Sequence, residues 1–300
     1  MHRIGLLYGA SPATTAQADE AFKQQLREYG FVEGENLVIE RRYGEGKLLQ
    51  INESAAELVR AKMDVIVTGN DPTIAAVKQE TQTIPIVMAN SSDPVGTGFV
   101  ASLARPGGNI TGLSTMSPEL SGKRLELLGE VVPGLARVAI VWNPNVRGAL
   151  FDYKETETVA RTRRLQLYSV EVTRGEDLPR AFAAIAKHRA QGLIVQTPNP
   201  VLFVNPSHIA RLALADRLPS IFGQVEFANA GGLMSYGSNT TERYRQAAHF
   251  VAKILKGANP ADLPVEQPTR FELVINMKTA RALGVTIPPS VLVRADKVIE

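Results

Sequence analysis

One alternating pattern of strands and helices runs through this chain twice, and it constrains the fold more than any other feature. In each half, short apolar runs typical of buried strands alternate with amphipathic stretches typical of helices. Strand–helix–strand units favour parallel sheets. We therefore predict an α/β fold with two Rossmann-like lobes. The predicted strands lie at residues 4–8, 37–43, 64–68, 84–89 and 110–114 in the first half, and at 137–142, 167–172, 192–196, 220–222 and 233–236 in the second.

The end of the sequence does not fit two successive domains. An amphipathic helix at 244–256 is followed by a proline-rich stretch at 260–268 and by a further strand at 271–277. This order predicts that the chain crosses between the lobes several times, which makes a multi-crossing hinge. We predict an N-terminal lobe of residues 1–116 with 238–262 returning to it, and a C-terminal lobe of residues 117–237 together with 263–300. The crossings are expected near residues 115–118, 236–239 and 261–268.

The composition excludes several classes of protein. The chain has no cysteine, so disulfides, thiolate metal sites and cysteine nucleophiles are ruled out. The net charge is +3 and no cluster of Lys or Arg stands out, which argues against a nucleic-acid partner. No uninterrupted apolar stretch reaches the ~18 residues that a transmembrane helix needs.

Patterns of catalysis and metal binding are also missing. The four histidines are far apart in the sequence, and none has the spacing of metal ligands. The sequence contains no Gly-x-Ser-x-Gly elbow and no Walker loop. We therefore predict a protein that is not an enzyme, with no catalytic residue, no metal and no cofactor.

Polar and aromatic residues gather where the predicted strands end. In open α/β sheets, ligands bind beyond the carboxyl ends of the strands, so these residues are the candidate ligand contacts. In the first lobe they are Tyr8, Ser11, Asn70, Asp71, Asn90, Ser91, Ser92 and Asp93; in the second they are Asn143, Asn145, Thr197, Asn199 and Gln224; Met116 and Tyr236 lie near the crossings.

The segment from Asn90 to Asp93 is the strongest of these candidates. It follows a buried strand and is expected to open a helix, so the hydroxyls of Ser91 and Ser92 and nearby backbone N–H groups suit a ligand carboxylate. Asp93 and Asp71 each precede a proline, and a role as helix N-cap is an alternative interpretation of both. An aspartate there would compete with a ligand carboxylate or pair with a ligand ammonium.

Two aromatic residues at strand ends suit a planar solute. Tyr8 and Tyr236 are placed to stack on such a ligand, whereas Trp142 fits core packing equally well.

Several longer motifs resemble a known family. They are residues 92–96 (SDPVG), 102–112 (SLARPGGNITG), 122–128 (GKRLELL), 231–237 (GGLMSYG), and 264–269 (PVEQPT) with 271–276 (FELVIN). Together, and in this order over essentially the whole chain, they resemble the substrate-binding proteins of ABC transporters in the tryptophan/tyrosine-binding-like family.

This resemblance implies a type I periplasmic-binding-protein fold and a function in solute import. The protein would bind a small polar or carboxylate-bearing solute in the cleft between the lobes, such as an aromatic amino acid or a related organic acid. It would deliver that solute to the permease subunits of an ABC transporter. A periplasmic or extracytoplasmic location is also implied, with the export signal absent from this sequence and contact with the membrane only through membrane proteins.

Two other functions remain open from the residues alone. One is a ligand-sensing domain of the same fold coupled to a receptor or regulator. The other is an enzyme built on paired Rossmann-like lobes, against which the missing catalytic motifs argue.

Overall fold

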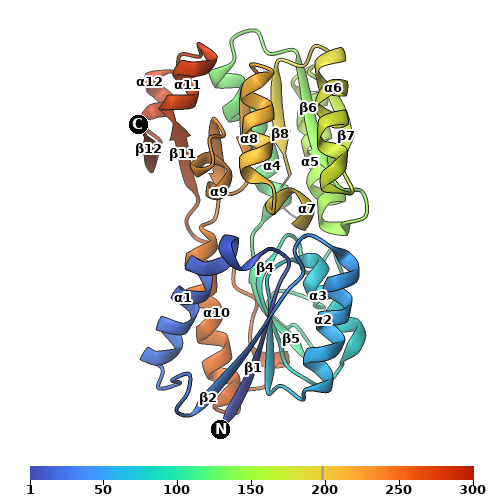
Figure 1. Cartoon of the computed structure of the whole chain (residues 1–300), viewed down its shortest axis with the longest axis vertical. Helices are drawn as coiled ribbons and strands as arrows, with labels where there is room; N and C mark the ends of the chain where they lie inside the picture. The colour runs from blue at the N-terminus through green and yellow to red at the C-terminus, as the bar shows by residue number, and fades with distance from the viewer. Residues whose placement is uncertain (197–198) are drawn as a thin grey trace. The chain divides into compact units, whose positions relative to one another are not determined.

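The computed structural model describes residues 1–196 and 199–300, which form two compact units (Figure 1). The N-terminal lobe consists of Met1–Met116 and Thr240–Thr269, and the C-terminal lobe of Ser117–Asn239 and Arg270–Glu300. Within the described residues, no helix is both long and apolar enough to cross a membrane.

The N-terminal lobe is a parallel sheet between two layers of helices. Its elements are β1 (His2–Tyr8), α1 (Pro12–Glu28), β2 (Leu37–Tyr43), α2 (Leu48–Arg60), β3 (Val65–Thr68), α3 (Asp71–Glu80), β4 (Ile86–Ser91), β5 (Ile110–Ser114) and α10 (Thr240–Leu255). The sheet order is β2-β1-β3-β4-β5, and every neighbouring pair is parallel. Helices α1 and α10 cover one face, and α2 and α3 cover the other (Figure 1).

The C-terminal lobe has a larger sheet with the same layered plan. Its elements are α4 (Ser117–Val131), β6 (Arg137–Trp142), α5 (Arg147–Thr162), β7 (Gln166–Glu171), α6 (Leu178–Lys187), β8 (Gly192–Val195), α7 (Pro200–Phe203), α8 (Pro206–Ala215), β9 (Ser220–Phe222), α9 (Val225–Asn229), β10 (Met234–Gly237), β11 (Glu272–Asn276), α11 (Met277–Leu283), α12 (Pro289–Leu292) and β12 (Lys297–Ile299). The strand order is β12-β11-β10-β9-β8-β6-β7. Side chains from α6 to α9 build the core on one face, and those from α4, α5, α11 and α12 build it on the other.

The late part of the chain differs from the simplest prediction in two ways. Strand β11 runs antiparallel to β10, so the C-terminal sheet is parallel except at this pair. The expected boundary after residue 262 also moves, because the chain stays with the N-terminal lobe to Thr269. The backbone N–H of Val265 donates to Leu103 and that of Glu266 donates to Gly112, at 2.8 and 2.9 Å, which fixes this proline-rich stretch along β5.

The segment after β4 also differs from the prediction. The helix expected to begin at Asp93 and Pro94 is instead a series of turns. Asp93 stabilises these turns, since its Oδ1 accepts from the N–H of Gly96 at 2.8 Å.

One glycine of the family motifs is explained by close backbone approach. Gly112 on β5 has a φ of 128°, and a Cβ at this position would overlap the carbonyl of Met88 on β4. The pairing of these two strands is irregular at this point. Only glycine fits both the backbone angle and the space.

Candidate functional site

The carboxyl end of the N-terminal sheet holds a closed cluster of polar side chains, which we call the Asp71 cluster (Asp71, Ser91 and Ser92). Asp71 is 4% exposed, and its Oδ1 accepts from the hydroxyl of Ser91 at 3.0 Å and from the N–H of Ser92 at 3.1 Å. Its Oδ2 accepts from the hydroxyl of Ser92. The two serine protons expected to bind a ligand carboxylate are therefore donated to Asp71, which leaves only the hydroxyl oxygens available as acceptors.

Asp71 is not the helix cap that its position before Pro72 suggested. Asn70 is the N-cap of α3: its Oδ1 accepts from the N–H of Thr73 at 3.1 Å, and the Thr73 hydroxyl accepts from the N–H of Asn70 at 3.0 Å. The carboxyl of Asp71 is thereby free to join the start of α3 to the end of β4. Burial raises the pKa of Asp71, and the hydrogen bonds from Ser92 and Ser91 partly offset that rise.

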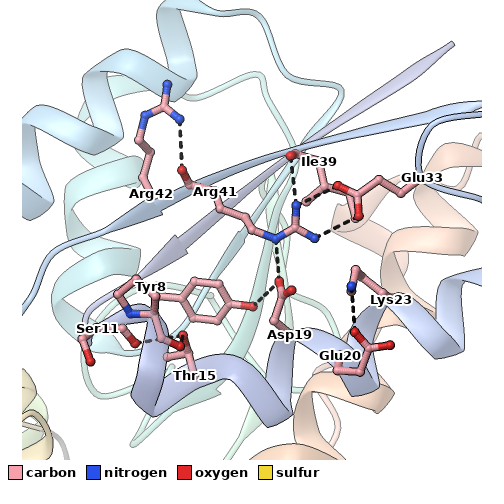
Figure 2. A network of polar contacts seen from close by, with 11 residues as sticks. Tyr8, Ser11, Thr15, Asp19, Glu20, Lys23, Glu33, Ile39, Arg41 and Arg42 are labelled. Atoms are coloured by element: carbon pink, nitrogen blue, oxygen red, sulfur yellow. Dashed lines mark hydrogen bonds and ion pairs between the residues drawn. The ribbon is translucent and has the colours of Figure 1, made fainter.

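Tyr8 lies inside the N-terminal lobe. Its ring is 1% exposed and stacks on Tyr43 and Tyr244, with both pairs of ring centroids 5.4 Å apart. Its hydroxyl donates to Asp19 at 3.1 Å (Figure 2). Burial raises the pKa of this hydroxyl. Because Tyr43 and Tyr244 already contact the ring, its placement favours a structural role over stacking on a ligand.

Asp19 is shared between Tyr8 and an arginine of the neighbouring strand. Arg41 donates its Nε to Asp19 at 2.9 Å and its Nη1 to Glu33 at 2.7 Å (Figure 2). Burial alone would lower the pKa of Arg41, but these hydrogen bonds raise it. The network ties α1 to β2 and fixes the tyrosine stack from one side.

The remaining candidates of this lobe lie at a helix cap, at a strand end and in the segment that leaves the lobe. Ser11 is the N-cap of α1, and its hydroxyl lies 2.9 Å from that of Thr14. Asn90 is half-buried at the end of β4. Met116 ends the lobe with a φ of 52°, and its N–H donates to the hydroxyl of Ser114 at 3.2 Å. Their roles as ligand contacts stay predictions.

The C-terminal sheet presents several amides where its strands end. Asn143 is buried after β6, and its Oδ1 accepts from the N–H of Asn145 at 3.0 Å, while the side chain of Asn145 is exposed. Thr197, another predicted contact, lies outside the described residues. Tyr236 is half-buried on β10 and packs against Phe271 with ring centroids 6.1 Å apart.

Three buried groups in this lobe have side-chain atoms without a hydrogen-bond partner, and we call them the C-lobe triad (Asn199, Gln224 and Ser235). Within the described part of the chain, the Nδ2 of Asn199, the Oε1 of Gln224 and the Oγ of Ser235 make no hydrogen bond. The residues are 1%, 7% and 1% exposed. Buried polar groups are nearly always paired, so these three open atoms are exceptions to that rule.

The sequence analysis named Asn199 and Gln224 as candidate ligand contacts and did not name Ser235. Asn199 and Gln224 follow strands and stand at the starts of α7 and α9. Ser235 lies within a strand, where alternation alone does not separate a buried structural serine from a ligand contact. Its place in the 231–237 motif was the one available signal.

The sequence analysis also did not name Arg124, a buried arginine of the C-terminal lobe. It is buried on α4, and its Nε donates to the carbonyl of Tyr236 at 2.9 Å. Burial lowers the pKa of Arg124, and the charge of Asp152 opposes that shift. Ser117 donates to Asp152 at 2.6 Å, so the start of α4, α5 and β10 are joined by buried polar contacts.

A separate surface pocket lies in the N-terminal lobe. It has a volume of about 330 Å³ and contains none of the predicted contacts. The pocket is lined by Gln25, Tyr29, Glu242, Arg245, Gln246, His249 and Glu266.

The described residues include no group of His, Asp and Glu placed to hold a metal ion.

Comparison with known families gives a result consistent with the fold of the two lobes. The model of the family described as ABC transporter substrate binding protein matches residues 10–299. This chain belongs to that family. The predicted resemblance is confirmed, and so is the fold, which is that of type I periplasmic binding proteins. The family and the similar proteins bind solutes and are not enzymes.

Three similar proteins cover nearly the whole chain. A tyrosine-binding protein of Clostridioides difficile is 24% identical over 93% of this chain and 80% of that protein. The crystal structure of a conserved domain protein from Vibrio cholerae has a TM-score of 0.93, with 27% identity and 99% of each chain covered. An ABC domain from Streptococcus pneumoniae in complex with L-Trp has a TM-score of 0.92, with 23% identity and 99% of each chain covered.

Proposed function

We propose that this protein is the solute-binding component of an ABC importer and that it delivers its solute to the permease subunits of the transporter. The C-lobe triad carries the proposal, because buried donors and acceptors without a partner in the described part of the protein are what a receptor presents to a ligand. The membership of the chain in the substrate-binding family supports it independently.

We further propose that the solute is small and polar, and that it is an aromatic amino acid or a related organic acid. Two similar proteins support this class: one is described as tyrosine-binding, and the other was crystallised with L-Trp. The neutral amides and hydroxyls at the sheet edges suit a polar head group of this kind.

The proposed contacts come from both lobes. We keep the residues predicted from the sequence apart from Tyr8, whose burial against Tyr43 and Tyr244 favours a structural role. The hydroxyl oxygens of Ser91 and Ser92 are proposed as acceptors. The proposed contacts are Ser11, Asn70, Asp71, Asn90, Ser91, Ser92, Asp93, Met116, Asn143, Asn145, Thr197, Asn199, Gln224 and Tyr236.

The same family supports a proposal about the place of action. Substrate-binding proteins of ABC transporters are generally extracytoplasmic. We propose a periplasmic or extracytoplasmic location for this protein, where it meets its transporter without a nucleic-acid partner and touches the membrane only through membrane proteins.

A thermal-shift screen tests the proposal. The panel contains L-tryptophan, L-tyrosine and L-phenylalanine, the matching deaminated acids, and two controls of different chemistry, ribose and spermidine. A ligand that binds only the folded protein adds about 2.7 kcal/mol to its stability at a hundredfold excess over Kd, so a true ligand raises the melting temperature clearly. We expect a rise with an aromatic compound and none with the controls. Titration calorimetry then gives the Kd. A panel in which no aromatic compound shifts the melting temperature contradicts the proposed ligand class.

A further inference from the structure

Four arginines stand at the amino edge of the C-terminal sheet, where its parallel strands begin. Arg164 comes before β7, Arg189 before β8 and Arg217 before β9, and Arg137 is the first residue of β6. These strands are neighbours in the order β9-β8-β6-β7 and run parallel, so the arginines lie one per strand along a single edge. We call them the arginine row (Arg137, Arg164, Arg189 and Arg217).

The register of the sheet places the members of the row at nearly the same level. Arg137 pairs with Gln166 of β7, and the next residue, Val138, pairs with Gly192 of β8. The Nε of Arg137 donates to the carbonyl of Arg189 at 2.8 Å, which joins two members directly. Neighbouring strands are about 4.8 Å apart, so the row is about 14 Å long. Because each arginine comes from a different part of the chain, no run of basic residues marks the row in the sequence.

Three members of the row have a backbone conformation that arginine rarely adopts. Arg164, Arg189 and Arg217 directly follow the caps of α5, α6 and α8, with left-handed φ angles of 57°, 50° and 52°. Glycine is the usual residue at such a helix end, because a Cβ makes this conformation costly. The helix end before β10 of the same sheet has a glycine there, Gly231, with a φ of 107°. The three arginines are exposed, so packing in the core does not explain them.

The positive charges of the row are not neutralised within the lobe. In the part of the chain that the structure describes, no member of the row forms an ion pair, whereas the neighbouring Arg163 bonds to Glu126 at 2.7 Å. Asp216 is the one acidic residue of these helix–strand turns. Arg161 and Lys187, in the last turns of α5 and α6, already complement the helix dipoles there. The row therefore adds positive charge beyond what the helix ends require.

We propose that the arginine row binds an acidic segment of a partner protein, whose Asp or Glu carboxylates pair with the guanidinium groups along one extended chain. A guanidinium group binds a carboxylate through two parallel N–H donors, and the row presents four such groups in a line. An extended chain spans about 3.3 Å per residue, so a segment of about five residues covers the row. Charges on one line favour a single chain over a membrane surface, which offers its head groups in a plane.

This surface is separate from the candidate solute site. The candidate ligand contacts of the C-terminal lobe lie toward the carboxyl ends of the strands, whereas the row lies at their amino ends. The inference therefore goes beyond the proposed function and does not depend on it. Changes in the row should leave the Kd for a solute unchanged.

Fluorescence anisotropy with labelled hexaglutamate tests the inference on the full chain, with hexaglutamine as the uncharged probe. At low salt we expect the wild type to bind hexaglutamate and not hexaglutamine. A triple variant, Arg164→Asn with Arg189→Asn and Arg217→Asn, removes three charges, and asparagine tolerates the left-handed conformation. We expect this variant to bind hexaglutamate about 10-fold more weakly, because each exposed ion pair contributes modestly. A wild type that binds the two peptides equally overturns the inference.

A second triple variant controls for net charge. It combines Arg27→Gln, Lys62→Asn and Arg105→Gln, which remove three exposed cations of the N-terminal lobe. Lys62 has the same left-handed conformation after α2, with a φ of 56°. Thermal denaturation checks that both variants fold. We expect the control variant to bind hexaglutamate within about twofold of the wild type. Equal weakening in the two triple variants would mean that net charge alone acts, and the row would not be a binding surface.

Two competitors test the choice of partner. Tripolyphosphate presents phosphate groups in solution, and vesicles of phosphatidylglycerol present them on a membrane. At equal concentration of negative charge, we expect unlabelled hexaglutamate to displace the labelled peptide more effectively than either competitor. If tripolyphosphate or the vesicles displace it more effectively, the row is a phosphate-binding surface and the inference of an acidic protein segment is wrong.

Discussion

Both sheets carry buried polar groups near the carboxyl ends of their parallel strands, yet the two lobes pair these groups differently. In the N-terminal lobe, Asp71, Ser91 and Ser92 bond to one another, and Tyr8 bonds to Asp19. In the described part of the C-terminal lobe, the Nδ2 of Asn199, the Oε1 of Gln224 and the Oγ of Ser235 have no hydrogen-bond partner.

The difference separates two uses of a buried polar residue. A polar group that is paired within the protein stabilises the fold, and its loss leaves a partner unsatisfied. A polar group that is left open costs stability until a ligand pairs it. We therefore expect substitutions in the Asp71 cluster to act first on stability, and substitutions in the C-lobe triad to act first on affinity.

The largest effect on stability is expected at Asp71. Asp71→Ala removes the acceptor for the Ser91 and Ser92 hydroxyls and for the N–H of Ser92. Leaving these donors unpaired in the interior should lower the free energy of unfolding by about 3 kcal/mol or more. Urea denaturation measures it. As a comparison, Asp93→Ala loses one bond, to Gly96, at a half-buried site, and should cost about 1 kcal/mol. Equal midpoints for the two variants would refute the structural role of the cluster.

Tyr8→Phe should have the next largest effect. It removes one hydrogen bond to Asp19 and keeps the ring stack, so we expect a loss of about 1 to 2 kcal/mol with no change in ligand affinity. Tyr153→Phe is the control, because its half-buried hydroxyl contacts Glu157 at 3.3 Å at an exposed site and also bonds to Ser169, so its removal should cost less than that of the buried Tyr8 hydroxyl. A large loss of affinity in Tyr8→Phe would restore Tyr8 as a ligand contact.

The pH dependence of stability tests the raised pKa of the buried Asp71 carboxyl. Burial raises the pKa of Asp71 above its ordinary value of 3.8, so the folded state holds this proton more tightly than the unfolded state. The contribution of the Asp71 carboxyl to the free energy of unfolding therefore falls as the pH rises from about 3.8 through the pKa of the folded state. Asn cannot titrate. The stability of the wild type relative to Asp71→Asn should thus fall over that range and then level off. A difference that stays constant over this range would contradict the assigned shift.

The smallest effect on stability is expected at the C-lobe triad. Gln224→Met replaces a buried oxygen that has no hydrogen-bond partner by apolar atoms, so the free energy of unfolding of the ligand-free protein should not fall and should rise by at most about 0.5 kcal/mol. The same denaturation experiment measures it. A loss of unfolding free energy comparable to that of Asp71→Ala would contradict the difference between the Asp71 cluster and the C-lobe triad.

The strand order, and with it the position of the candidate residues relative to the strands, could be predicted from the sequence. Polar residues after β4, β6, β8 and β9 were placed at the sheet edges because the carboxyl ends of parallel strands meet there. The duplicated β/α pattern and the return of α10 to the first lobe were likewise visible in the hydrophobic periodicity.

Contacts between distant segments were not predictable in the same way. Both Asn70 and Asp71 precede Pro72, and local sequence does not decide which one caps the helix. The answer depends on Ser91 and Ser92, which come from the next strand. Tyr8 was expected to face a ligand, but Tyr244 of α10 covers its ring, and no local pattern links these two residues.

The most direct test of the account is a crystal structure of the full chain with the aromatic amino acid that binds most tightly in the screen. We predict that the Nδ2 of Asn199, the Oε1 of Gln224 and the Oγ of Ser235 each lie within about 3.2 Å of the ligand head group. The hydrogen bonds of Asp71 to Ser91 and Ser92 should remain unbroken in that structure. A bound ligand whose carboxylate and ammonium contact none of the three triad atoms would contradict the account.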